Sequence, residues 1–140
     1  MSAIITIPRF RRILLRICDQ DTSFDPKGWT RKKRFWGHAD VVSLLAQSLF
    51  QGRIFGVSLK GTKFAKLKFH LWNFLPDKSM EDFTRSQFGR DYPGDSVIGV
   101  IEVSMLLANK NTNRRFKLLQ ERFETECNRG VKPPQDMGTS

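Results

Sequence analysis

The chain has 140 residues, of which 39% are hydrophobic and 11% are aromatic, a composition that is typical of one globular domain and excludes a largely disordered chain. Its net charge of +10 favours binding to polyanions, although a solvated basic surface explains the same excess. The sequence has no run of about 18 apolar residues, so we expect no membrane span. Two cysteines are too few for a disulfide framework, and no secretory signal is visible, so we expect a cytoplasmic protein. A single domain is expected over residues 1–129, followed by a disordered tail over residues 130–140.

Three segments have the apolar spacing of helices. They are residues 8–18, residues 39–50 and residues 113–127, the last with Thr112 as its N-cap. The middle segment is apolar on nearly every side, which predicts a buried central helix. Gly52 follows it and is expected to end it.

Alternation of apolar and polar residues predicts a small antiparallel sheet between the second and third helices. Strands are expected at residues 54–60, 64–74 and 80–84, and the apolar segment 97–107 is ambiguous between strand and helix. In the second strand, His70 and Trp72 should point to one face, and Asn73 to the other. The expected fold is α+β, with a central helix packed on the sheet and flanking N- and C-terminal helices.

Three positions occur in an order that suits a cysteine hydrolase, which needs a thiolate, a histidine base and a polar group to orient the base. Position 39 lies at a helix start, where the helix dipole lowers the pKa of a thiol, but the residue there is Ala39. His70 would be the base, and Asp82, on the next strand, could lie beside it. A histidine packed in the core and a carboxylate on the surface could have the same spacing without any catalytic role. This pattern alone therefore does not establish an active site.

Several short motifs occur in one order along the chain. They are Gly37-His38-Ala39, Leu49-Phe50-Gln51-Gly52, His70-Leu71-Trp72-Asn73, Leu75-Pro76-Asp77-Lys78, Asp82-Phe83-Thr84-Arg85-Ser86-Gln87-Phe88 and, near the end, Asn111-Thr112 with Arg115-Phe116. Over about residues 20–125, this series resembles the YunG-like proteins, small bacterial proteins with a papain-like or transglutaminase-like core. The resemblance implies that fold and a thiol-dependent reaction on an amide or ester, with a protein, peptide or amide substrate.

The chain departs from the family pattern at one decisive position. The pattern implies cysteine where this chain has Ala39, which has neither a nucleophile nor an acid–base group. We therefore expect an inactive form, either because a native cysteine was replaced or because the chain is a natural pseudoenzyme that kept its scaffold for binding. The retained His70 and Asp82 favour replacement. The resemblance further implies that the substrate is contacted by His38, Trp72 and Asn73.

The remaining candidates are weaker. Cys18 and Cys127 lie near helix ends, where the dipole disfavours a thiolate, so we interpret both as bystanders. Neither His38 nor His70 has a partner at metal-ligand spacing, so we expect no metal and no cofactor. The alternative function is a basic binding module without chemistry, which engages nucleic acid or an acidic protein.

Overall fold

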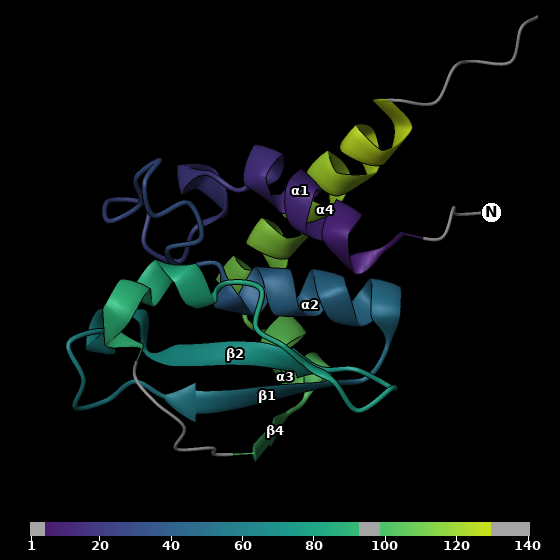
Figure 1. The fold of residues 1–140 in the computed structure, drawn as a ribbon. Helices are drawn as coiled ribbons and strands as arrows, with labels where there is room; N and C mark the ends of the chain where they lie inside the picture. The colour runs from purple at the N-terminus through teal and green to yellow at the C-terminus, as the bar shows by residue number, and fades with distance from the viewer. Residues whose placement is uncertain (1–4, 93–98, 130–140) are drawn as a thin grey trace, which may run out of the picture.

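The computed structural model describes residues 5–92 and 99–129 and has the predicted α+β class. In chain order its elements are α1 (Ile7–Ile17), the 3₁₀ turn η1 (Gln20–Thr22), α2 (Ala39–Phe50), β1 (Arg53–Ser58), η2 (Ala65–Leu67), β2 (Phe69–Phe74), β3 (Met80–Glu81), η3 (Arg85–Asp91), β4 (Gly99–Ile101), α3 (Val103–Ala108) and α4 (Lys110–Arg129). Figure 1 shows α2 between the sheet and the pair formed by α1 and α4. The tail predicted at residues 130–140 lies outside the described residues.

The sheet is antiparallel, with its strands in the order β3-β2-β1-β4. Its centre is the hairpin of β1 and β2, in which Val57 is paired with His70. β3 pairs only with the last two residues of β2, Asn73 and Phe74, so among the described residues no strand flanks His70 on that side. The start of β2 therefore borders non-strand segments, which is where the candidate site lies.

β2 is shorter than the predicted strand because the chain makes a 3₁₀ turn at η2 before it. Lys68 then has a φ of +70°, a left-handed conformation that a strand cannot contain. The ambiguous segment at residues 97–107 contains both structures, since its described part is the strand β4 followed by the helix α3.

The main apolar core lies where α1 and α4 pack on α2. Phe10 is fully buried there, with its ring edge-on to Phe50 and Phe83. Pro8 occupies the first turn of α1, and Thr6 caps that helix by accepting a hydrogen bond from the backbone N–H of Arg9. A second, smaller cluster fills the space between α2 and the sheet. It contains Ala39, Leu44, Ile54 and Leu71.

α4 begins earlier than predicted, and Thr112 is not its N-cap. The side chain of Asn109 accepts the hydrogen bond from the backbone N–H of Thr112, so Asn109 caps the helix and Thr112 lies in its first turn. The Thr112 hydroxyl instead donates to Asp40 at the start of α2. Among the helices of the described ranges, none has the length and hydropathy needed to cross a membrane.

Candidate active site

Ala39 is the first residue of α2, and its side chain is 7% exposed. It lines a cavity of about 340 Å³ at the start of the helix. Leu71 and Leu106 provide apolar walls, whereas Gln87 and Lys68 bring polar groups to it. Position 39 therefore faces a space that can accept a small chemical group at a helix N-terminus, where partial positive charge collects.

His70 and Asp82 are in direct contact. The imidazole Nε2 lies 2.7 Å from Asp82 Oδ2, and the Tyr92 hydroxyl donates to the same oxygen at 3.2 Å. Asp82 follows β3 directly. If the β2–β3 register is continued by one residue, Asp82 is opposite Trp72, which is two residues from His70 on the same face of β2. The predicted hydrogen bond between the two side chains is thus present, while its catalytic role stays a prediction.

The second ring nitrogen of His70 has no hydrogen-bond partner among the described residues. Within the described ranges, Nδ1 is buried and makes no hydrogen bond, as is also true of Asp82 Oδ1. Because Nε2 is bound to the carboxylate, Nδ1 is the ring nitrogen left for a further partner. A buried polar nitrogen without a hydrogen bond costs about 1–3 kcal/mol of stability.

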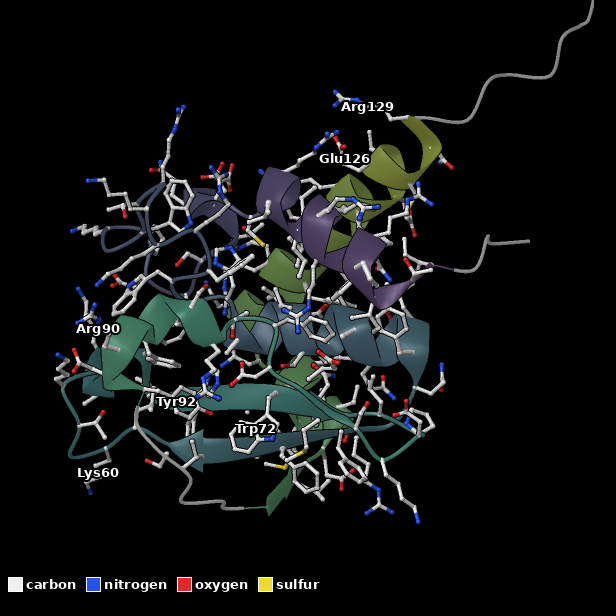
Figure 2. All side chains as sticks on the ribbon, in the orientation of Figure 1. Lys60, Trp72, Arg90, Tyr92, Glu126 and Arg129 are labelled. Atoms are coloured by element: carbon white, nitrogen blue, oxygen red, sulfur yellow. The ribbon has the colours of Figure 1, made fainter. Side chains whose placement is uncertain are left out.

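Aromatic side chains surround the imidazole, which is 0% exposed. The ring centroids of Trp72, Phe88 and Tyr92 lie 5.6, 4.7 and 5.8 Å from that of His70. In Figure 2, Tyr92 lies near the start of β2 and Trp72 lies further along the strand. These rings fix the imidazole orientation and keep water away from its hydrogen bond with Asp82.

The structure places Ala39 and His70 in neighbouring environments. Leu71 packs in the apolar cluster that contains Ala39, whereas His70 alternates to the other side of β2 and does not line the cavity. Gln87 connects the two environments, since it lines the cavity and accepts a hydrogen bond from the backbone N–H of Gly37, while the adjacent Phe88 packs on the imidazole. Direct contact between position 39 and His70 stays a prediction.

A family model described as YunG protein matches residues 6–128, a range that runs from the cap of α1 to the last turn of α4. The chain belongs to the YunG family. No curated protein and no solved structure matches it.

His38 is fully buried in this YunG family member, with both ring nitrogens occupied. Nδ1 lies 3.0 Å from the carbonyl oxygen of Trp36, and Nε2 lies 2.7 Å from the Thr22 hydroxyl. Burial lowers the pKa of His38 to about 4, so the ring is neutral at pH 7, donating from Nδ1 and accepting at Nε2. A substrate contact by this ring, as the resemblance implied, would require one of these hydrogen bonds to break.

Trp72 and Asn73 are also buried. The Asn73 amide donates to the carbonyl oxygen of Ser43 and thereby ties β2 to α2. Asn73 points to the α2 side of β2 and Trp72 to the His70 side, as the alternation predicted. The substrate contacts predicted for these two residues stay predictions.

Sequence reasoning did not single out the buried ion pair that holds the start of α2. The guanidinium of Arg115, 1% exposed, binds Asp40 through two hydrogen bonds of 3.1 and 2.6 Å. It also donates to the carbonyl oxygen of Thr22. Arg115 lies in the terminal motif of the YunG-like pattern, which was the available signal, whereas nothing in the sequence pointed to Tyr92 beside Asp82.

The two cysteines of this YunG chain are poor nucleophiles. Burial raises the pKa of the Cys18 thiol well above its ordinary value, and the pKa of Cys127 is raised by the same cause. For Cys18, burial is the largest cause of the raised pKa, followed by the nearby charge of Asp19.

Proposed function

We propose that this chain is the nucleophile-free form of a small thiol-dependent enzyme with a papain-like or transglutaminase-like arrangement, whose parent acts on an amide or ester. The observation that carries the proposal is the imidazole of His70. Its Nε2 is bound to a carboxylate, and its buried Nδ1 has no partner among the described residues. A thiol–imidazole–carboxylate site uses one ring nitrogen for the carboxylate and the other for the thiol.

Position 39 supplies the missing group in this proposal. A cysteine there would lie at the start of α2, where the helix dipole favours a thiolate, and would open onto the cavity that receives the substrate. Backbone N–H groups in the first turn of α2 have no helical partner and could stabilise an oxyanion.

The reaction of the parent follows from these roles. The thiolate attacks the carbonyl carbon, the imidazolium gives its proton to the leaving amine or alcohol, and an acyl-enzyme forms. Water or a second amine then releases the acyl group, which gives hydrolysis, deamidation or transamidation. Asp82 holds the ring and stabilises the imidazolium. The methyl group of Ala39 can start none of these steps.

Restoring the thiol tests the proposal. In Ala39→Cys, iodoacetamide at about pH 6.5 should modify residue 39 far faster than Cys18 or Cys127. A thiol of ordinary pKa, about 8.5, is roughly 1% ionised there, whereas one lowered to about 6.5 is half ionised, a difference of about fifty-fold. Mass spectrometry of the digested protein compares the three cysteines in one sample.

A second variant separates the effect of His70 on the thiol pKa from the effect of the helix dipole. Adding His70→Ala to Ala39→Cys should slow the labelling of residue 39 at least about tenfold, because the imidazolium that stabilises the thiolate is lost. Thermal unfolding of both variants checks that they remain folded. Labelling at equal rates with and without His70, or equal labelling of all three cysteines, would remove the thiol-enzyme proposal.

The second candidate function is a binding protein without chemistry that engages an anionic partner. One separate observation favours it, an arginine-lined groove on the far side of α2 from the sheet.

A further inference from the structure

α1 and α4 border a groove that is unrelated to the cavity beside Ala39. Its volume is about 330 Å³. We call it the arginine groove, and it is lined by Arg9, Arg12, Ile13, Arg16, Glu126 and Arg129. Arg9, Arg12 and Arg16 are spaced by three and four residues, so helix geometry puts them in one row along α1, about 10 Å from first to last.

The described lining of the arginine groove has four arginines and one glutamate, so positive charge is in excess, although Arg9 donates a hydrogen bond to the carbonyl oxygen of Cys127. The side chains of Arg16 and Arg129 are 67% and 66% exposed, although both reach Glu126, at 3.4 and 3.1 Å. Arg12 is exposed and makes no hydrogen bond or ion pair with any residue that the structure describes. Among the described residues, Glu126 is the only acidic group that lines this groove. It pairs with Arg16 and Arg129, as an external anion would.

The lining of the groove favours a phosphate backbone over other polyanions. An acidic protein partner would need an apolar centre to its interface, but the only apolar residue in the described lining is Ile13, which is 7% exposed. Insertion into a membrane needs an apolar helix face, and that face of α1 is buried in the core. Phosphate binding needs only cations, and guanidinium groups bind phosphate oxygens in pairs.

From these observations we infer that the arginine groove binds the phosphodiester backbone of a nucleic acid without reading its sequence. The row on α1 contacts successive phosphates of one strand, and Arg129 contacts the same strand from α4. Glu126 competes with the phosphates and lowers the affinity. This surface is independent of His70 and Asp82, so the inference does not rest on the proposed enzyme.

Fluorescence anisotropy tests the inference with two labelled oligonucleotides, one single-stranded and one duplex. The affinity of the unaltered chain should fall steeply between about 50 and 200 mM salt, because bound phosphates release counterions. The double variant Arg12→Ala/Arg16→Ala should weaken binding at least about tenfold at low salt. It should also reduce the log–log salt slope by about 1.4 to 1.8, or 0.7 to 0.9 for each phosphate that an arginine no longer neutralises.

The matched control removes the same number of charges elsewhere. Lys60 and Arg90 are exposed and lie at the opposite end of the molecule from Glu126 and Arg129 in Figure 2. The double variant Lys60→Ala/Arg90→Ala should leave the salt slope unchanged. The single variant Glu126→Gln should tighten binding about two- to fivefold, the range that one exposed ion pair is worth.

Three results would overturn the inference. Equal weakening in the two double variants would mean that net charge alone attracts the oligonucleotide. Tighter binding to polyglutamate than to either oligonucleotide would assign the groove to an acidic protein. No binding of the unaltered chain to either oligonucleotide at low salt would leave the arginines as a solvated surface. Because none of the four substituted basic residues packs in the core, each variant should fold, which circular dichroism checks.

Discussion

His38 should contribute to the destabilisation of the fold by acid. In the native state its neutral ring is buried between the Trp36 carbonyl and the Thr22 hydroxyl, and burial lowers its pKa from 6.5 to about 4. Between these values the unfolded chain binds a proton that the native chain does not. The native state is therefore favoured above pH 6.5 and loses this advantage as the pH falls through about 4, at about 1.4 kcal/mol for each pH unit. The whole effect is on the order of 3 kcal/mol.

The assay is urea unfolding at a series of pH values, compared with the variant His38→Gln. Glutamine offers a hydrogen-bond donor and an acceptor at this position without titrating. Other groups titrate in both proteins, so the difference between the two free energies of unfolding isolates His38. That difference should shift in favour of the variant by about 3 kcal/mol between pH 7 and pH 4. Parallel pH profiles would show that the buried ring does not control acid stability.

Two further pairs of substitutions test the packing of the chain. Arg115→Ala should lower the free energy of unfolding by about 3–5 kcal/mol because Asp40 loses the partner of a buried ion pair, whereas Arg114→Ala, at an exposed position outside that pair, should change it by less than about 0.5 kcal/mol. Gly52→Ala and Gly61→Ala both place alanine at a positive φ, which should lower the free energy of unfolding by about 1–2 kcal/mol. Only at Gly52 would the new Cβ also collide with a backbone carbonyl, which should lower it by a further ~1–3 kcal/mol. Equal destabilisation in urea unfolding within either pair would contradict the packing described for that position.

The sequence predicted α2 accurately because its apolar residues are dense and Gly52 ends the run. The predicted bounds were right at both ends, but the C-cap is Gln51, at a φ of +67°, and not Gly52, which follows it at +89°. The start of β2 was wrong because alternation continues through residues 65–68, although those residues turn. Lys68 takes a left-handed conformation that is unusual for lysine, and no composition rule predicts such a residue.

The candidate site was predictable only where local geometry determines it. Asp82 could be placed beside His70 because neighbouring strands bring their side chains together. Tyr92 could not, since its hydroxyl reaches Asp82 from η3's end by tertiary packing. Arg115 was missed for a different reason. Arginine is almost never fully buried unless it is paired, and the partner of Arg115 lies in a distant part of the chain, so the local sequence does not predict its burial.

The ion pair at the start of α2 sets an order of events during synthesis. Asp40 and Arg115 are separated by 75 residues, so at about 5–20 residues per second the ribosome needs roughly 4–15 s to make the second after the first. Throughout that interval the apolar side chains of α2 have no α4 to pack on, and the carboxylate of Asp40 has no counter-charge. We expect the nascent chain to be bound by chaperones in this window, and a chain that stops before Arg115 to be degraded.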